Sequence, residues 1–348
     1  MNSPPTAPPR WLLINAALGF AAWIALAWAP LPTDIVSAGI QRLTLVGPLV
    51  AAPLILAMLE PDAGQRRARI AWLAASWLQL PCAALAIAAH YRAPGLEAAL
   101  LAVPWLLVTL ACALYGLARL ISRATSSPQA PLTLKTALDR VGPIDALCVD
   151  AGLAYVVVGA TWMIIARSGV ILEAFDPLIV QLTAAHFHFA GFTAPIITGL
   201  IGPLIPADRP RARAAFAIAA VAVIAGPPLI GIGISISPLM EVICALILAS
   251  GLLVLAALMA FVVGPALKNT IAWGLMLIAS LSLVLTMALA CAYATGEFLG
   301  QSWILIPRMA ETHGLANVFG FSLCGLIALL LIRSPGQRDP GQRADAQP

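Results

Sequence analysis

The chain has 348 residues, of which 61% are hydrophobic and 10% are charged. Soluble domains carry roughly 45–50% apolar and about 25% charged residues, so this composition excludes an ordinary soluble domain. The net charge of +4 does not indicate nucleic-acid binding, because the basic residues lie in short clusters between long apolar runs. We therefore expect the lipid bilayer, and no nucleic acid, as a partner.

Ten apolar runs of membrane-spanning length predict the architecture. A hydrocarbon core about 30 Å thick needs roughly 20 residues of α-helix. The runs cover residues 11–29, 43–59, 70–90, 96–118, 145–166, 178–204, 212–234, 238–263, 270–294 and 309–332. The sequence therefore predicts an all-α, polytopic transmembrane bundle of about ten helices.

The distribution of lysine and arginine predicts the orientation of this bundle, because cytoplasmic loops are rich in these residues. When the loops are assigned alternately to two sides of the membrane, fifteen basic residues fall on one side and four on the other. The sparsely charged side holds Arg42, Arg92, Arg167 and Arg308. We therefore expect both termini on the cytoplasmic side.

This topology divides the chain into five segments. Residues 1–10 form a cytoplasmic tail, residues 11–120 form helices one to four, and residues 121–143 form a cytoplasmic connection. Residues 144–332 form helices five to ten and carry the candidate site. Residues 333–348 lack an apolar run to bury and are expected to be a disordered cytoplasmic tail.

The first apolar run also resembles a secretory signal. Residues 27–29 (Ala-Trp-Ala) imitate a small-x-small cleavage site. The run exceeds the usual length of a signal core, and a further span follows closely, so we expect an uncleaved helix. Cleavage is the alternative, and it leaves the orientation of the later helices unchanged.

Two histidines in the sixth run are the first candidates for a functional site. Ionisable side chains inside a membrane cost at least about 2.5–3.5 kcal/mol and mark functional positions by default. Residues two apart on an α-helix point about 200° away from each other, so His186 and His188 are expected to address different environments. Thr183 shares a face with His186. Hydrogen bonding to neighbouring helices, as mere packing, is the alternative.

The start of the tenth run adds a second polar group. His313 and Asn317 are spaced i and i+4, which places them on one face of a helix. Glu311 lies near the helix N-terminus, where the dipole favours a negative charge. The alternative is an ordinary solvated helix start.

The fifth run contains Asp150, which lies deeper than the helix end. A carboxylate at such a depth is a candidate for a proton relay. A contact that pairs two helices is the alternative.

The seventh run is expected to be broken. Gly226, Pro227, Pro228 and Gly231 remove two backbone donors and loosen the chain that follows. Broken helices in carriers expose backbone carbonyls to a solute. A simple proline kink is the alternative.

Residues 186–192 (HFHFAGF) and 312–321 (THGLANVFGF) resemble the two signature segments of the YndJ-like family of bacterial membrane proteins. The two motifs occur in order near expected helix ends, and the helical pattern fits the family over most of the chain. The resemblance implies an integral protein of the bacterial cytoplasmic (inner) membrane. It brings no biochemical activity with it.

Residues 185–189 (AHFHF) are also similar to the haem-ligating helix of haem–copper oxidases, where two histidines on opposite faces hold different haems. This resemblance implies haem or a transition metal as a cofactor, with His186, His188 and His313 as candidate ligands. That family needs six histidine ligands, whereas this chain has four histidines. A complete oxidase site is therefore excluded. A single haem held by two histidines is the cofactor site that the resemblance still implies.

Three functional classes follow from these residues. A secondary carrier or permease would use the histidines and the broken helix as a site for a small molecule, ion or proton in the outer half of the membrane. A redox protein would use the histidines as haem or metal ligands. A structural or sensory membrane protein would use them only for packing. The sequence favours the carrier, and the lack of Walker A, G-x-S-x-G and H-E-x-x-H motifs argues against an ATP-driven pump or a common hydrolase.

Overall fold

The computed structural model describes residues 8–61, 64–126, 142–173 and 175–333. Ten helical spans in these ranges are long and apolar enough to cross a membrane, which confirms the predicted architecture. Six spans are single α-helices: α1 (Arg10–Trp28), α4 (Arg66–His90), α5 (Leu96–Ser126), α7 (Ile144–Ser168), α10 (Pro210–Ile236) and α12 (Thr270–Phe298).

The other four spans change helical type along their length. The second is α2 (Ile35–Val46), the π-helix η1 (Gly47–Ala51) and α3 (Ala52–Met58). The sixth is α8 (Pro177–His186), the π-helix η2 (Phe187–Thr193), α9 (Ala194–Ile201) and the 3₁₀-helix η3 (Gly202–Leu204). The eighth is α11 (Pro238–Leu258), the π-helix η4 (Met259–Val263) and the 3₁₀-helix η5 (Gly264–Ala266). The tenth is α13 (Ile306–Met309), the π-helices η6 (Ala310–Gly314) and η7 (Ala316–Leu323), and α14 (Cys324–Arg333).

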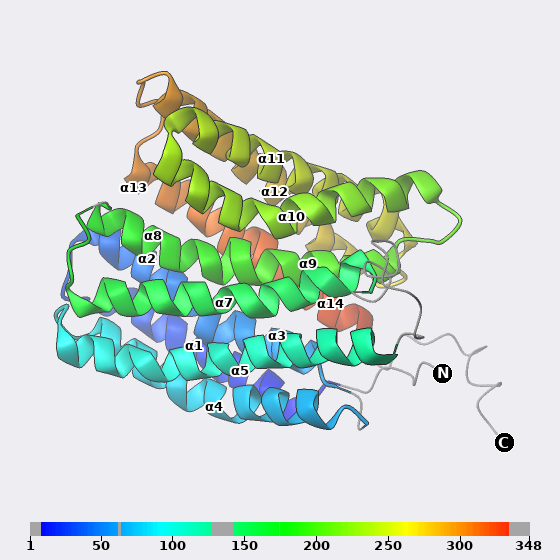
Figure 1. The fold of residues 1–348 in the computed structure, drawn as a ribbon, viewed down its shortest axis with the longest axis horizontal. Helices are drawn as coiled ribbons and strands as arrows, with labels where there is room; N and C mark the ends of the chain where they lie inside the picture. Colours follow the sequence, from blue (N-terminus) through cyan, green and yellow to red (C-terminus); the bar gives the residue numbers. More distant parts are fainter. Residues whose placement is uncertain (1–7, 62–63, 127–141, 174, 334–348) are drawn as a thin grey trace.

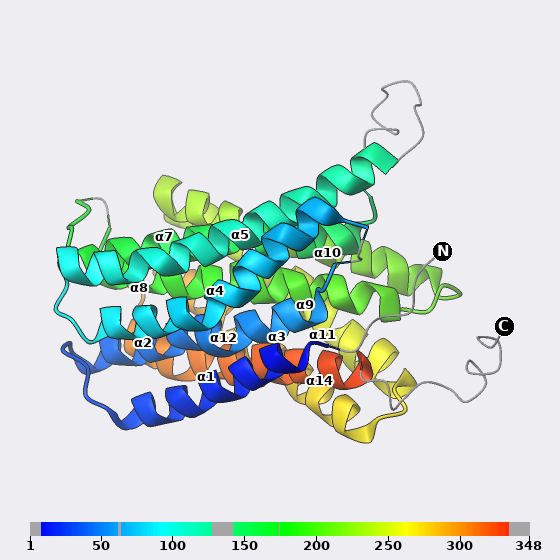
Figure 2. The same cartoon turned by 90° about the horizontal axis from the view of Figure 1, so that it is seen from below.

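The helices run roughly parallel or antiparallel along the long axis of the molecule (Figure 1). We call the end of the bundle where α1 begins and α14 ends the near end, and the opposite end the far end. Helices α4, α5 and α7 lie next to the sixth span in one layer, while α1, the second span and α14 lie behind them (Figures 1 and 2). The second and sixth spans are the most buried, so the π-helices η1 and η2 lie in the centre of the bundle.

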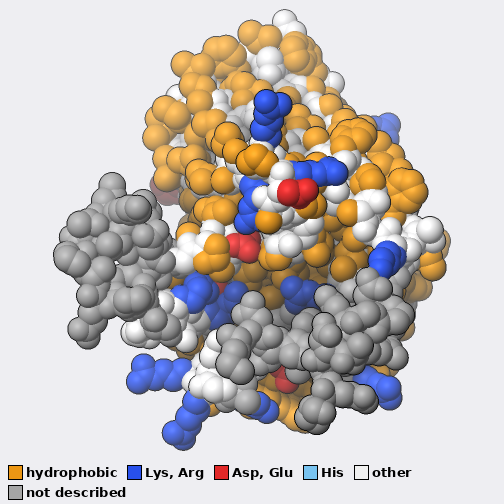
Figure 3. All heavy atoms as spheres, turned by 90° about the vertical axis from the view of Figure 1, so that its right-hand side faces the viewer, with side chains coloured by type: hydrophobic (Ala, Val, Ile, Leu, Met, Phe, Trp, Pro, Cys, Tyr) orange, Lys and Arg blue, Asp and Glu red, His pale blue; other side chains and the backbone are white. Residues whose placement is uncertain are grey.

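Basic side chains are spread over the near end. Figure 3 shows Lys and Arg, with fewer Asp and Glu, on a face otherwise rich in hydrophobic side chains. The same excess of Lys and Arg is the reason why the sequence predicts that the near end faces the cytoplasm. This orientation stays a prediction.

The expectation of a broken seventh helix is wrong. Helix α10 continues through Pro227 and Pro228 to Ile236 as one α-helix. Pro228 has no N–H, so it leaves the carbonyl of Ile224 without its helical donor. The hydroxyl of Tyr155 on α7 donates to that carbonyl at 2.9 Å. A hydrogen bond from a neighbouring helix therefore compensates the proline where the sequence alone predicts a break.

In the second span, which does contain a π-helix, a side chain of a neighbouring helix likewise bonds to a carbonyl that a proline leaves free. In the i+5 register of the π-helix η1, the carbonyl of Pro48 would pair with residue 53, which is a proline and has no N–H. The buried amide of Gln79 on α4 donates to Pro48 O at 2.7 Å instead. A polar side chain inside the membrane thus satisfies a backbone group that proline leaves free.

The predicted segment boundaries need one adjustment. Helix α5 continues beyond residue 120 to Ser126, so the connection to α7 begins later than expected. Most of the predicted connection, and the predicted tail after Arg333, lie outside the described residues.

Candidate functional site

His188 is fully buried in the centre of the bundle. Its Nδ1 lies 2.7 Å from the carbonyl oxygen of Ala184, and its Nε2 lies 2.9 Å from Nε1 of Trp105 on α5. A carbonyl only accepts and an indole N–H only donates, so His188 is the neutral tautomer with its proton on Nδ1. Both ring nitrogens are used, and the imidazole joins the sixth span to α5.

Two glycines make room for the His188 ring. A Cβ atom on Gly47 of η1 would lie 2.9 Å from the ring, and one on Gly159 of α7 would lie 2.8 Å from it. Such distances are far inside van der Waals contact. The ring therefore fills a slot between the second span and α7, and its place is that of a helix-packing residue.

His186 lies in a different environment, as the spacing predicts. Its side chain is exposed, and its Nδ1 lies 2.7 Å from the carbonyl oxygen of Leu182 in the preceding turn. Its Nε2 makes no hydrogen bond to any described residue. The ring centroid lies 6.4 Å from that of His313 on the tenth span. The structure therefore brings His186 and His313 together and leaves His188 apart.

His313 and Asn317 form the contact that their spacing predicts, although they lie in π-helices. The amide of Asn317 donates to Nε2 of His313 at 3.0 Å, and Nδ1 of His313 donates to the carbonyl of Thr286 on α12 at 2.9 Å. The hydroxyl of Thr286 lies 3.3 Å from Oδ1 of Asn317. These three residues close a polar ring between the last two spans.

The remaining candidates of the sixth and tenth spans make local contacts. Thr183 donates to the carbonyl of Ile179 in its own helix at 2.8 Å. Glu311 is exposed and pairs with Arg308 at 3.0 Å. Neither side chain joins the pair formed by His186 and His313.

The arrangement of the possible ligand side chains gives little support for a metal centre. Among the described residues, no group of three or more His, Cys, Asp or Glu side chains is arranged to hold a metal ion. His186 and His313 would be two ligands only, and Nε2 of His313 already accepts from Asn317. His188 has no free lone pair, since Trp105 occupies its Nε2.

Asp150 lies in an ion-pair cluster near the near end. Its carboxylate is 2.8 Å from Nε of Arg119 and also contacts Arg123, both on α5. The guanidinium of Arg119 also lies over the ring of Tyr115, at 5.6 Å from the centroid. The arrangement fits the helix-pairing alternative for Asp150. The sequence signal for it is the i, i+4 spacing of the two arginines on one face of α5.

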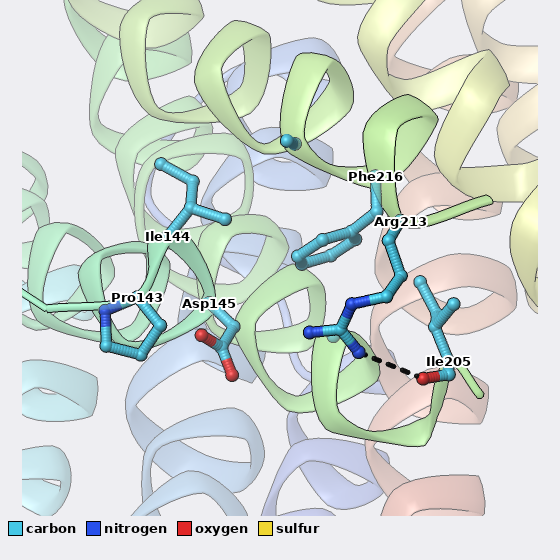
Figure 4. Close-up of a pocket in the computed structure, with 8 residues that line it drawn as sticks. Pro143, Ile144, Asp145, Ile205, Arg213 and Phe216 are labelled. Atoms are coloured by element: carbon cyan, nitrogen blue, oxygen red, sulfur yellow. Dashed lines mark hydrogen bonds between the residues drawn. The ribbon is translucent and has the colours of Figure 1, made fainter. Parts of the chain in front are cut away.

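A small cavity opens at the near end between α7, α10 and the end of the sixth span. It has a volume of about 200 Å³ and is lined by Asp145, Gly202, Ile205, Arg213 and Phe216, among others. Figure 4 shows the Asp145 carboxylate and the Arg213 guanidinium on facing sides of it, with Arg213 donating to Ile205 O at 3.3 Å. A second cavity, of about 190 Å³, lies at the far end of the same pair, α7 and the sixth span.

Between these cavities, α7 and the sixth span pack through glycines. A Cβ on Gly152 would lie 2.8 Å from the carbonyl oxygen of Phe192, and one on Gly199 would lie 2.4 Å from that of Asp145. Small residues allow such close backbone approach between membrane helices. The contact between α7 and the sixth span therefore separates the two cavities.

Comparisons with known proteins agree with the resemblance seen in the sequence. The model of the YndJ-like protein family matches residues 42–321. A relative from Bacillus subtilis (strain 168), the "Uncharacterized membrane protein YndJ", is 30% identical over 188 residues. The aligned stretch covers 54% of this chain and only 33% of the relative. No solved structure matches the chain. Since the family model covers most of the chain, the protein belongs to the YndJ-like family.

Proposed function

We propose that this YndJ-like membrane protein is a secondary carrier for a small solute in the bacterial cytoplasmic membrane, with both termini in the cytoplasm. The observation that carries the proposal is the exposed imidazole of His186 beside His313, about 13 Å along the sixth span from its far-end start. A site at this depth, in the outer half of the membrane, suits a solute or proton that enters from the far end.

The exposure of His186 supports a polar crevice. An imidazole facing lipid would lose its hydration without compensation, and ionisable side chains inside membranes almost always face a protein interior or a water-filled cavity. Nε2 of His186 has no described partner, so it is free to contact water or a solute.

The changes of helical type beside His186 and His313 also support a carrier. His186 is the last residue of α8, directly before the π-helix η2, and His313 lies in the π-helix η6. Short π-helices inside α-helices are frequent at functional sites. The cavities at opposite ends of α7 and the sixth span, separated by a glycine-packed contact, fit an occluded carrier.

The alternatives draw on fewer observations. A redox centre at His186 and His313 would have only two imidazoles and would have to displace the Asn317 amide from His313. A purely structural role accounts for His188, whose two nitrogens both bond to protein. It does not account for His186, which makes no hydrogen bond to another helix among the described residues.

Solute uptake into liposomes that contain the protein tests the proposal. Purified protein reconstituted in liposomes with a trapped pH-sensitive dye is offered a panel of small organic acids, amines, amino acids and sugars. We expect uptake of at least one solute, and at least a tenfold lower rate in His186→Ala at equal incorporation. Cys148→Ala, a buried position outside the crevice, is the matched control and should transport normally. Equal rates in His186→Ala and the control would contradict a role for His186.

A further inference from the structure

The far-end cavity lies between the starts of α2 and α8 and the end of α7. Its volume is about 190 Å³, and its polar lining comes from Thr33, Gln41, Arg167 and Gln181. Drug-sized ligands occupy pockets of roughly 300–1,000 Å³, so this cavity suits a smaller molecule. The rest of the lining is mainly apolar and includes Val170 and Pro177.

Arg167 brings a buried positive charge to this cavity. The residue is 3% exposed, and its guanidinium donates to two backbone carbonyls, those of Ala89 at 3.2 Å and of Arg92. Among the described residues, no carboxylate lies within 4.0 Å of it. A buried charge without a counter-ion is costly, so an anion that enters the cavity would gain a strong partner.

Gln41 brings to the cavity a side-chain amide that does not use all of its hydrogen-bonding atoms. It is 5% exposed; its Nε2 donates to Oε1 of Gln181 at 3.1 Å, and Nε2 of Gln181 donates to Oγ of Ser37 at 3.2 Å. Oε1 of Gln41 is buried and has no hydrogen-bond partner among the described residues. Rotating both amides keeps the chain of bonds intact and leaves the nitrogen of Gln41 unpaired instead. In either case one amide atom of Gln41 lacks a partner, and in the rotated form it is a donor.

We propose that this cavity binds the carboxylate group of a small organic acid with a short apolar body. A guanidinium with free donors recognises a carboxylate through paired hydrogen bonds, and the rotated amide of Gln41 would supply a further donor. The apolar lining favours a ligand with a hydrocarbon part over inorganic phosphate, which is polar on every side. Neither His186 nor His313 is among the described residues that line this cavity, so the inference goes beyond the proposed carrier site.

Calorimetric titration of the full chain in detergent tests the site directly. The probes are acetate, butyrate and benzoate, with butyramide as the neutral analogue of butyrate and inorganic phosphate as the fully polar anion. We expect butyrate or benzoate to bind, and butyramide and phosphate to bind at least tenfold more weakly. No binding of any carboxylate, equal binding of butyramide, or tighter binding of phosphate would each overturn the proposal.

Substitutions distinguish a loss of ligand binding from a loss of folding. Arg167→Lys is expected to raise the dissociation constant at least tenfold, because an ammonium cannot form the paired bonds. Arg167 also bonds to backbone, so a second variant avoids it: Ala166→Phe fills the cavity that Ala166 lines, and Ala154→Phe on the exposed face of α7 is its control. Binding that survives Ala166→Phe would overturn the site. Binding without vesicle uptake would instead remove the carrier and leave the site.

Discussion

Replacing Asp150 by alanine is expected to lower the free energy of unfolding by about 3–5 kcal/mol, the range found when one partner of a buried ion pair is removed. The Asp150 side chain is 8% exposed and joins α7 to Arg119 and Arg123 of α5. Its loss would leave the guanidinium of Arg119, itself only 21% exposed, without its carboxylate. Thermal and denaturant unfolding in a mild detergent would measure the change.

A double-mutant cycle with Arg119→Ala isolates the pair. If the buried charge causes the loss, the double variant should recover part of the stability that Asp150→Ala alone removes. Asp145→Ala is the matched control, because Asp145 lies on the same helix and makes no ion pair with a described residue. A loss in Asp150→Ala no larger than that in Asp145→Ala would show that the ion pair does not hold the helices together.

Replacing His188 by alanine is expected to lower the free energy of unfolding by about 3 kcal/mol. The change empties the slot between Gly47 and Gly159 and leaves the indole N–H of Trp105 buried without its acceptor. Large-to-small substitutions in cores cost about 2–5 kcal/mol, and a stranded buried donor costs about 1–3 kcal/mol. Unfolding in detergent, followed by tryptophan fluorescence, would measure it.

His186→Ala is the control for this prediction, since it removes the same side chain two residues away. Within the described part of the chain, His186 forms a hydrogen bond only to its own helix, so its loss should change the stability by less than about 1 kcal/mol. The two histidines are thus expected to separate a structural effect from a functional one. Equal destabilisation by the two substitutions would mean that His186 is a packing residue as well.

The number and type of the spans could be predicted from the sequence, because a chain in lipid must satisfy its backbone groups within helices. The places where helices change type could not. Pro227 and Pro228 look more disruptive than Pro53 or Pro195, yet α10 stays regular and the second and sixth spans contain π-helices. Side chains of neighbouring helices, such as Tyr155 and Gln79, bond to carbonyls that the prolines leave free, and no local pattern reveals them.

The candidate site was predictable only where its members are close in sequence. The opposite environments of His186 and His188 follow from helix geometry, and so does the contact of His313 with Asn317. Trp105, which bonds to His188 from α5, was missed, because an indole in an apolar run carries no sign of its partner. The cavity around Arg167 was missed as well, since its polar lining comes from three elements far apart in the chain.

The proposed carrier function requires a water-accessible crevice at His186, and cysteine accessibility measures whether water reaches this position. In a variant without the native cysteines, His186→Cys is compared with Ala184→Cys, which is buried, and with Leu281→Cys, which is exposed near the middle of α12. A charged, water-soluble thiol reagent is applied to the membrane-embedded protein. We expect rapid modification at position 186 and almost none at the other two, because neither the protein core nor the lipid admits the reagent. Modification at 186 as slow as at 281 would place the imidazole against lipid and contradict the carrier site.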